Sequence, residues 1–541
     1  MTDDPKQQTP AEGLDALFAK WNRMDEPGLV VGVAHRGAVI YRRGFGMASL
    51  ESGLVNTPKT RMRIGSTTKH FTCLAALLLA EEGKLDIDAG IRTYIPELPA
   101  FDPDPTLRQL MNHTGGLRCF IDLAMYSSGI SAIPDGGALD FMVRQHDRNF
   151  APGDEMIYCN GGYFLLSLAI ERVSGLSFEA FLKERIFLPL GMTDTVAHSS
   201  DLELLSGMAT LHNAAADGSF TRGIFPVRIK GEGSIVSTID DMLGWIRHLR
   251  AADHRVGGAE TWRQMLTRPR YNSGTESNYC LGLSREFYRG IETIHHAGGV
   301  MGGQSQMLTV PDHELDIIIM ANRSGTDPSG LALKIIDILL ADALDPLSAK
   351  VEGTVGEAVA GRYHGARSHL LYGLSVTDGK LGFSLSNSPA MPLTAGADGA
   401  FALSIPGMGD FVIRANDPVE GKSRSIVVDY CGRQEAAERL PDEPPETAAA
   451  ADGFVGRYDG PDQGAGATVT LVDGHLRLAL QGQYGRTVYK LMPVSRDVFA
   501  GMADDPLLPL PLSITAHRTG GQVDLFWIDT GRTRHLQFTR L

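Results

Sequence analysis

The chain has 541 residues, of which 43% are hydrophobic and 21% charged, and this composition is typical of a globular protein with several domains. The formal net charge of −14 argues against nucleic acid or an anionic membrane as a main partner, because both repel an acidic surface. No apolar run approaches the roughly 20 residues that cross a bilayer, so we expect no membrane partner.

The N-terminus and the cysteines favour a cytoplasmic location. Residues 1–8 are polar and lack the apolar core of a signal peptide. The five cysteines are scattered, and no two of them form a Cys-x-x-Cys pair. A disulfide framework is therefore not expected, and a reducing compartment is the simplest interpretation.

Residues 1–345 are predicted to form a first domain of mixed helices and strands. The β-branched stretch 29–41 contains turn residues and predicts a hairpin. Amphipathic patterns predict helices over residues 66–82, 161–173 and 331–344, and one more helix that Thr238 caps.

The rest of the chain contains an internal repeat. Gly-Arg-Tyr at residues 361–363 recurs at 456–458, an offset of 95 (457 − 362), and the Asp-Gly turn at residues 378–379 recurs at 473–474, the same offset. Short alternating strands between such turns, present twice, predict two small antiparallel β-barrels or two sheets of similar size. We place them at residues 346–442 and 443–541, with a Pro- and Ala-rich linker between the copies.

The second copy is longer than the first. Met391-Pro392 matches Met492-Pro493 at an offset of 101, so six extra residues (101 − 95) are expected within residues 481–489. One interpretation is an insertion in a surface loop, which loops tolerate. The other is that this loop reaches a different domain and takes part in its function.

The first chemical motif is Ser66-Thr67-Thr68-Lys69, at the predicted start of a helix. The spacing of three places the Lys69 amine and the Ser66 hydroxyl on one face. A cation in the first helical turn is disfavoured, and this favours the neutral amine that a general base requires. Gly65 allows a sharp entry into the helix. The alternative is a capping serine followed by a solvated lysine.

The second motif is Tyr158-Cys159-Asn160, between a turn and an apolar helix. Side chains two apart on an extended segment point the same way. Tyrosine can transfer a proton, and asparagine can hold a substrate amide. A buried aromatic beside a turn-forming asparagine would also explain these residues.

The third motif, residues 295–299, reads His-His-Ala-Gly-Gly after a β-rich stretch. Such glycines let a strand approach a ligand closely, and an edge strand can offer an amide N–H to an oxyanion. A glycine turn with incidental histidines is the structural alternative. A metal site at these histidines is the weaker interpretation, because no His-Glu-x-x-His pattern or carboxylate–histidine cluster at ligand spacing occurs, and we predict no metal and no cofactor.

In this order, the three motifs resemble those of the penicillin-recognising serine hydrolases. Tyr-x-Asn and His-x-Gly are the forms typical of the branch with class C β-lactamases, D,D-carboxypeptidases, esterases and D-aminopeptidases. Residues 112–117 and 189–195 match further family landmarks, and the resemblance covers about residues 15–345. It implies a β-lactamase-like catalytic domain, so the expected fold is a multidomain α+β protein in which two antiparallel β-barrels follow that domain.

The chain is most similar to the D-aminopeptidases of this family, in residues 69–73 and 158–161 and in the two expected barrels. This resemblance implies a homodimer whose last barrel sends a specificity loop into the cleft. Tyr484 and Arg486, in the extra segment, are therefore candidate substrate-binding residues. The segment carries no carboxylate for a substrate amine, and this departs from what charge pairing requires.

The resemblance also implies the roles of the site residues. Ser66 would form the acyl-enzyme, while Lys69 and Tyr158 take its proton and pass it to the leaving group. The backbone N–H groups of Ser66 and Gly299 would hold the oxyanion. Substrate binding would fall to Asn160, His296, Gly298 and Gly299.

The sequence leaves three functions open. The first is a D-aminopeptidase that acts on small peptides, amino acid amides or esters. The second is an esterase, a β-lactamase or a D,D-carboxypeptidase. Action on the cell wall or on antibiotics takes place outside the cytoplasm, and this disagrees with the expected cytoplasmic location. The third is a penicillin-binding sensor that is acylated without turnover. β-Lactam compounds are expected to inhibit the first.

Overall fold

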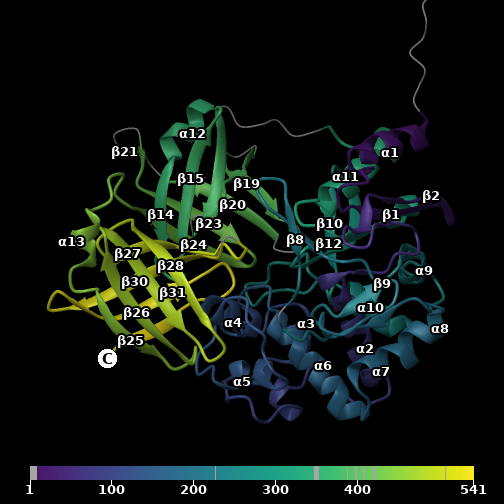
Figure 1. Cartoon of the computed structure of the whole chain (residues 1–541), viewed down its shortest axis with the longest axis horizontal. Helices are drawn as coiled ribbons and strands as arrows, with labels where there is room; N and C mark the ends of the chain where they lie inside the picture. Colours follow the sequence, from purple (N-terminus) through teal and green to yellow (C-terminus); the bar gives the residue numbers. More distant parts are fainter. Residues whose placement is uncertain are drawn as a thin grey trace, which may run out of the picture. The chain divides into compact units, whose positions relative to one another are not determined.

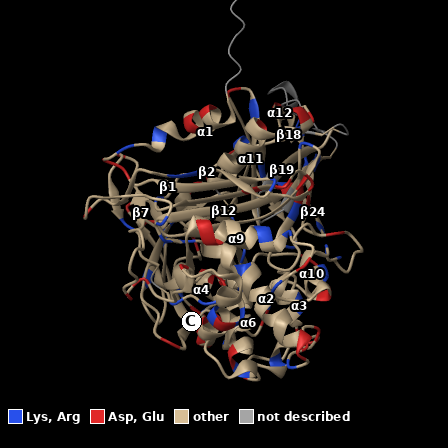
Figure 2. Ribbon diagram, turned by 90° about the vertical axis from the view of Figure 1, so that its right-hand side faces the viewer, with Lys and Arg blue, Asp and Glu red and all other residues tan. Residues whose placement is uncertain are grey.

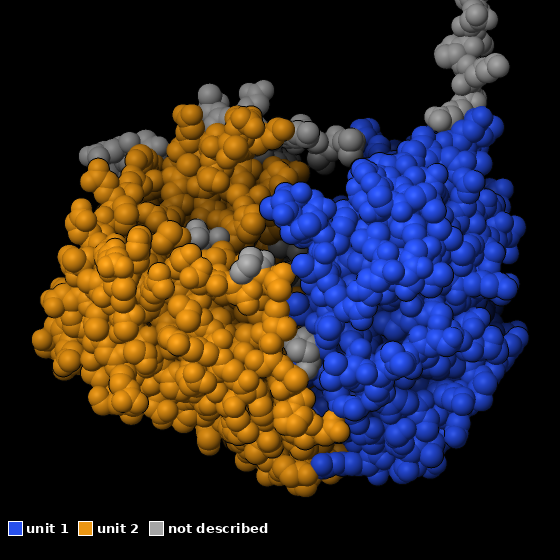
Figure 3. All heavy atoms as spheres, in the orientation of Figure 1, with its two compact units in different colours: residues 1–89, 163–269, 278–347 blue, residues 90–162, 270–277, 348–541 orange. Residues whose placement is uncertain are grey.

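The computed structural model describes residues 9–225, 227–346, 353–386, 388–396, 399–405, 409–416, 418–419, 422–505 and 507–541. The chain divides into two compact units, coloured blue and orange in Figure 3. The first unit comprises residues 1–89, 163–269 and 278–347, and the second comprises residues 90–162, 270–277 and 348–541.

The first unit is built on a six-stranded antiparallel sheet with the order β10-β11-β12-β13-β1-β2 (Figure 1). The predicted hairpin is confirmed, with a tight turn at Arg36 and Gly37, whose φ angles are 51° and 79°. The strands of this sheet are β1 (Leu29–His35), β2 (Ala38–Phe45), β10 (Ser284–Tyr288), β11 (Ile291–Val300), β12 (Gly303–Val310) and β13 (Leu315–Ala321).

Helices pack on both faces of this sheet. α1 (Pro10–Phe18) and α11 (Pro328–Leu339) share a buried core with Val31 and Val33 of β1. α9 (Ile239–Leu249) covers the other face, where Leu243 lies 3.0 Å from a Cβ built on Gly32. Burial of each such Val or Leu side chain stabilises the fold by roughly 1.5–3 kcal/mol.

The helix predicted after Ser66 is confirmed, but its first turn is tighter. A 3-10 turn (Gly65–Thr68) leads into α2 (Lys69–Glu81), whose Phe71 ring lies 4.0 Å from the Trp245 ring of α9. Trp245 donates its indole N–H to Nδ1 of His70 at 3.1 Å. Because burial lowers the pKa of His70 to about 3, this histidine is neutral and serves packing.

The other predicted helices of this part are also present. They are α6 (Asn160–Ser174), α9, whose cap Thr238 accepts from the Asp241 N–H at 3.4 Å, and α11, which ends before residue 344. The remaining elements of the first unit are η1 (Ala19–Trp21), β3 (Met47–Ser49), β4 (Leu54–Val55), β5 (Met62–Arg63), α7 (Phe178–Leu182), η4 (Lys183–Phe187), α8 (Leu188–Leu190), β6 (Val196–Ala197), β7 (His212–Ala214), β8 (Phe220–Arg222), β9 (Ile235–Ser237), α10 (Ala259–Leu266), η5 (Pro311–His313) and η6 (Ala341–Ala343).

The second unit combines a helical segment with the two repeated β modules. Its helices are η3 (Ile91–Thr93), α3 (Leu107–Met111), α4 (Phe120–Ser128), α5 (Gly137–Val143), α12 (Gly353–Val359) and α13 (Thr447–Ala451). This unit does not follow chain order, and the division into three consecutive domains stays a prediction.

The first β module is an antiparallel sheet that curls round until its edges meet. The edge strands β17 (Met391–Pro392) and β18 (Thr394–Ala395) are separated in the chain by Leu393 alone, so together they act as one interrupted strand. The path therefore has eight strands, as in a barrel. Its other strands are β14 (Gly361–Gly365), β15 (Leu371–Thr377), β16 (Lys380–Leu385), β19 (Phe401–Ile405), β20 (Gly409–Ala415), β23 (Ser425–Tyr430) and β24 (Arg433–Arg439), with β21 (Pro418–Val419) and β22 (Lys422–Ser423) forming a separate pair.

The second β module is a closed eight-stranded barrel, in yellow tones in Figure 1. The prediction of two antiparallel barrels after a mixed α+β region is confirmed. Its strands are β25 (Gly456–Gly460), β26 (Ala465–Val472), β27 (His475–Gln481), β28 (Arg486–Pro493), β29 (Val498–Ala503), β30 (Pro511–Thr519), β31 (Gln522–Asp529) and β32 (Leu536–Arg540).

The two modules close in the same way. Tyr363 pairs with Arg439 between first and last strands, and Tyr458 pairs with Arg540. Each arginine donates to its tyrosine hydroxyl, and its guanidinium lies 5.7 Å or 4.8 Å from the tyrosine ring centroid. A cation–π contact therefore joins the ends of both modules.

The strand register revises where the extra residues lie. Phe383 pairs with Met391, and Leu478 pairs with Tyr489, so the fourth strands are offset by 98 (489 − 391). The last strands are offset by 101 (540 − 439). Three of the six extra residues thus precede the fourth strand and three follow it. The sequence match of Met391 with Met492 is not a structural equivalence.

Positively and negatively charged residues are interspersed along the ribbon in Figure 2, so the acidic residues are not gathered on one element there. No helix among the described residues is both long enough and apolar enough to cross a membrane.

Candidate active site

Ser66 lies in the 3-10 turn before α2, and this turn presses against β11. Gly65 has a φ of 52°, and a Cβ there would lie 2.8 Å from the Gly299 nitrogen. A Cβ on Gly298 would lie 1.9 Å from the Ile64 carbonyl oxygen. Side chains at these positions would therefore push the serine turn off the strand, which is the close approach predicted for the third motif.

The predicted edge character of the third motif is partly confirmed. Pairing of β10 with β11 begins at Ser284 opposite His295, and β11 continues to Val300 with β12 alone beside it among the described strands. The backbone around Gly299 thus has one side without a neighbouring strand there. A strand of this kind can offer an amide N–H to an oxyanion.

Lys69 is fully buried and directed at Ser66. Its Nζ donates to Oγ of Ser66 at 3.1 Å and to the carbonyl oxygen of Glu232 at 2.7 Å. It also lies 5.2 Å from the centroid of the Tyr163 ring. The predicted pairing of the Ser66 hydroxyl with the Lys69 amine is present in the structure, and the pair has the geometry of a nucleophile with its base.

Glu232 is a buried carboxyl group that the sequence analysis missed. The residue is 2% exposed, and neither carboxylate oxygen has a hydrogen-bond partner among the described residues. Burial raises the pKa of Glu232 to about 7, although the nearby charge of Lys69 opposes this shift. In the sequence, a single acid between Gly231 and Gly233 is typical of a surface turn, so no local signal indicates burial.

His296 lies near Lys69, and its imidazole ring is neutral. Burial lowers its pKa well below the usual value, and the charge of Lys69 adds to this effect. Its Nε2 lies 2.9 Å from the Tyr279 hydroxyl, and Nδ1 lies 2.5 Å from the Ala297 carbonyl oxygen. A neutral ring donates through Nδ1 and accepts from Tyr279, so His296 is held in one orientation.

Tyr158 belongs to the second unit, where His113 fixes its backbone. His113 has a φ of 61°, and its Nδ1 accepts from the Cys159 N–H at 3.0 Å. The rings of His113 and Tyr158 lie 4.2 Å apart. Asn160 follows as the first residue of α6. The second motif is thus held at a helix entry by a residue in a strained conformation, which is typical of functional sites.

Arg532 is a further residue that the sequence analysis did not identify. It lies between β31 and β32 of the second barrel, with its guanidinium carbon 5.0 Å from the centroid of the Tyr158 ring. Burial alone would lower the pKa of Arg532, but the charges of Asp122 and Tyr158 outweigh burial and raise it. The attraction between the Arg532 cation and a negatively charged Tyr158 stabilises both partners. Arg532 therefore favours a negative charge on the Tyr158 oxygen.

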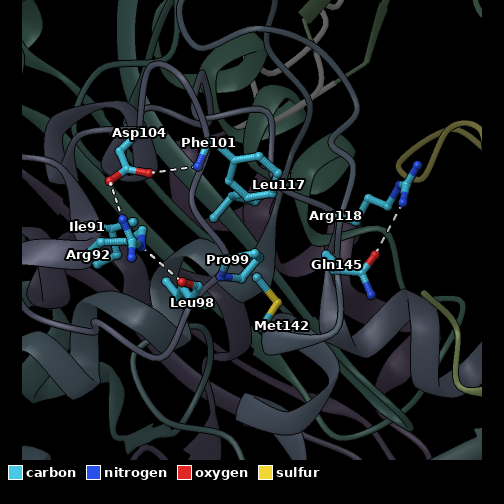
Figure 4. A pocket seen from close by; sticks show the side chains of 10 residues that line it. All are labelled: Ile91, Arg92, Leu98, Pro99, Phe101, Asp104, Leu117, Arg118, Met142 and Gln145. Carbon is cyan, nitrogen blue, oxygen red and sulfur yellow. Dashed lines mark hydrogen bonds and ion pairs between the residues drawn. The ribbon is translucent and has the colours of Figure 1, made fainter. Parts of the chain in front are cut away.

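The segment that carries Arg532, residues 530–535, is anchored from both sides. Arg118 donates to the carbonyl oxygens of Arg534 and His535 at 3.0 Å and 2.9 Å. Asn149 donates to the Arg532 carbonyl oxygen at 2.9 Å and accepts from the Arg534 N–H at 2.9 Å. Arg118 also lines a small pocket with Phe101, Leu117 and Met142 (Figure 4). The last barrel thus contributes a fixed cation beside Tyr158.

The predicted specificity loop, residues 481–489, contacts helices α4 and α5 of the second unit. Gly482 donates its N–H to the Ser127 carbonyl oxygen of α4 at 3.2 Å, and the Tyr484 ring lies 6.0 Å from the Phe141 ring of α5. Arg486 begins β28 and is exposed. The loop therefore reaches residues outside its own barrel, while substrate binding by Tyr484 and Arg486 stays a prediction.

Replacement of Glu232 by glutamine is expected to change how stability depends on pH. The native carboxyl, with a pKa of about 7, binds more proton than the unfolded carboxyl, with a pKa of 4.5, so wild-type stability falls as pH rises between these values. Glu232→Gln removes up to about 3 kcal/mol of that fall. Urea unfolding from pH 4.5 to 8 measures it, with the exposed Glu184→Gln as control. Parallel curves for wild type and Glu232→Gln would contradict the shifted pKa.

Comparisons with known proteins agree with this geometry. The family profile described as Beta-lactamase matches residues 15–341. The chain is 29% identical over 324 residues to a D-aminopeptidase of Brucella canis, across 58% of this chain and 60% of that protein. It is 27% identical over 547 residues to a D-aminopeptidase of Cereibacter sphaeroides, across 98% of this chain and 99% of that protein.

The chain thus spans 60% of the length of the Brucella relative and nearly all of the Cereibacter relative. Among solved structures, the octameric penicillin-binding protein homologue from Pyrococcus abyssi has a TM-score of 0.57 at 20% identity, across 89% of this chain and 100% of that chain. The predicted β-lactamase-like fold is confirmed. Since the matching profile covers more than half of the chain and its serine–lysine pair is assembled here, the chain belongs to the Beta-lactamase family.

Proposed function

We propose that this protein is a D-aminopeptidase, a serine hydrolase that removes N-terminal D-residues from peptides, amides and esters through an acyl-enzyme on Ser66. The observation that carries this proposal is the buried contact of Lys69 Nζ with Ser66 Oγ at 3.1 Å. The name of the Cereibacter relative supports the substrate class, because that similarity extends through both barrels.

The first chemical step is acylation. Lys69 takes the hydroxyl proton of Ser66, and Oγ attacks the carbonyl carbon of the substrate. The tetrahedral intermediate carries a negative oxygen, which the backbone N–H groups of Ser66 and Gly299 stabilise. The carbon–nitrogen bond then breaks, and the leaving amine takes up one proton. Water then adds to the ester carbon and gives one proton to the phenolate of Tyr158, and Lys69 returns its proton to Ser66 Oγ as the ester bond breaks and the D-amino acid leaves.

Tyr158 is proposed to give the leaving amine its proton, and Asn160 to hold the substrate amide. The cation of Arg532 supports this role, because it stabilises the phenolate that Tyr158 becomes after transfer. His296 is proposed to line the substrate site with Gly298. As a neutral imidazole it contributes hydrogen bonds rather than charge.

A second candidate is favoured by the charges of the last barrel. Arg532 lies beside Tyr158, and residues 482–488 contain Arg486 and no carboxylate. A free substrate amine prefers a negative partner. An esterase or a D,D-carboxypeptidase acting on a neutral or acidic substrate agrees with these cations, and the substrate comparison below separates the two candidates.

The other predicted properties are also proposals. The substrates are small peptides or amino acid amides, and β-lactam compounds are proposed to acylate Ser66 and inhibit. The protein is proposed to be a cytoplasmic homodimer that binds neither nucleic acid nor membrane.

The substrate class is tested by kcat/KM on D-alanine p-nitroanilide, its N-acetylated form and its L-enantiomer. A D-aminopeptidase is expected to prefer the free D-amine by about 100-fold or more, since an unpaired buried polar group costs the analogue about 1–3 kcal/mol per lost contact. Equal rates on all three, or activity on the acetylated compound alone, would support the second candidate.

Ser66→Ala is expected to lower kcat by about 1,000-fold or more, because the nucleophile is lost. Circular dichroism and melting temperature should match the wild type, since only one oxygen is removed. Intact mass after incubation with a penicillin provides an independent check: wild type gains one adduct and Ser66→Ala gains none. Full turnover by Ser66→Ala would refute the acyl-enzyme.

Arg532→Gln is expected to lower kcat/KM by about 10- to 100-fold, because Tyr158 loses the cation that stabilises its phenolate during proton transfer. Since Tyr158 acts as the proton donor and Arg532 favours its phenolate, the alkaline limb of the pH–rate profile should move to higher pH, and loss of packing alone would not cause this shift. Arg457→Gln, an exposed arginine on β25 of the same barrel, is the matched control. Unchanged profiles for both variants would remove Arg532 from the site.

A further inference from the structure

Two histidines and an aspartate that are far apart in the sequence meet between the two β modules. His369 lies in the turn between β14 and β15, Asp529 ends β31, and His535 precedes β32. Nδ1 of His369 lies 3.6 Å from Oδ2 of Asp529, and Nδ1 of His535 lies 3.4 Å from Oδ1. One donor atom from each residue falls within 4.8 Å of the other two.

The cluster leaves buried polar atoms without partners. The Asp529 side chain is 0% exposed, and its Oδ2 has no hydrogen bond among the described residues. Nδ1 of His369 is in the same position. An unsatisfied buried polar atom costs about 1–3 kcal/mol, and a buried charge costs more. A cation bound between these two atoms would satisfy both of them together.

Backbone strain and neighbouring contacts hold the three donors in place. His369 and His535 both have a φ of 55°, an unusual conformation for residues with a side chain. The Ser513 hydroxyl contacts the carbonyl oxygens of His369 and Asp529 at 3.1 Å and 3.2 Å. The His535 N–H donates to Oδ1 of Asp529 at 2.7 Å, which leaves Oδ2 to face His369. Outer contacts of this kind are typical of metal ligands.

We propose that His369, Asp529 and His535 bind one divalent transition metal ion of the zinc type. Two imidazole nitrogens and one carboxylate oxygen are a donor set that zinc prefers. Zinc bonds of about 2.0–2.1 Å in a tetrahedron place donor atoms about 3.3 Å apart. The two imidazole nitrogens lie 3.6 Å and 3.4 Å from the two different oxygens of the Asp529 carboxylate, and one donor atom of each residue lies within 4.8 Å of the other two, so small side-chain movements would bring three donors to this separation. The histidine side chains are 20% and 28% exposed, so the cluster lies near the protein surface.

The metal ion would stabilise the segment that presents Arg532. Asp529 and His535 bracket residues 530–534, and His369 belongs to the other β module. An ion bound by all three residues closes this short loop at its base and ties it to the first module. The ligand residues are therefore positioning residues for Arg532. The binding site itself does not depend on the proposed peptidase activity.

Zinc content of the full-length protein tests this proposal. Protein stripped with EDTA and incubated with zinc is expected to retain one ion per chain after gel filtration. His369→Asn and Asp529→Asn are expected to retain less than about a tenth as much, because each removes a ligand. Asparagine tolerates the φ of His369, so its backbone is preserved. His364→Asn is the matched control: this ring stacks 5.8 Å from His369 but bonds to Thr515 at 2.9 Å.

Cobalt substitution of the wild type gives a second measurement that needs no variant. A site of nitrogen and oxygen ligands shows weak d–d bands without cobalt–thiolate charge transfer. Hydrogen exchange of residues 530–534 should also rise after EDTA treatment. Failure of stripped wild type to bind either ion, equal zinc retention by Asp529→Asn, or thiolate bands would overturn the proposal. Serine turnover is not part of these readouts, so their failure is distinguishable from failure of the proposed function.

Discussion

The buried contact between Lys69 and Ser66 is the constraint on which the chemistry of this protein depends. An amine with no exposed surface needs hydrogen-bond acceptors, and the Ser66 hydroxyl and the Glu232 carbonyl provide them. Burial raises the pKa of the nearby Glu232 carboxyl group to about 7, so this group is mostly protonated and neutral at moderately acid pH. It then does not hold the amine in its charged form. The glycines of β11 are required by the same constraint, because they let the serine turn lie against the strand.

The sequence predicts the parts of this arrangement that depend on local spacing. Ser66 and Lys69 are three residues apart, so a helical turn is enough to bring them together. The two barrels were predictable because the Gly-Arg-Tyr pattern and the Asp-Gly turn occur twice. The positions of the extra residues were not, because an insertion can be absorbed anywhere along a strand path. Strand register, which is a property of hydrogen bonding, was needed to divide the six residues into two groups of three.

The residues that the sequence analysis missed all act over long separations. Arg532 lies 374 positions (532 − 158) after Tyr158, and nothing in Thr530-Gly531-Arg532 distinguishes it from a surface turn. The His369, Asp529 and His535 cluster has no ligand spacing of the kind that motifs record. Residues 481–489 were predicted to form a specificity loop because an insertion can be detected from sequence length alone. The segment 530–535 has no such mark, although it contacts Tyr158 directly.

The repeated tyrosine–arginine pair that closes each β module has a consequence for how this protein evolved. Because Tyr363 with Arg439, and Tyr458 with Arg540, join the first and last strands of the same module, each module is closed by residues of its own segment of the chain. A duplication of one such module therefore yields a copy that closes by itself. The turn that carries Arg532 lies outside both tyrosine–arginine pairs, so its sequence can change without opening either module.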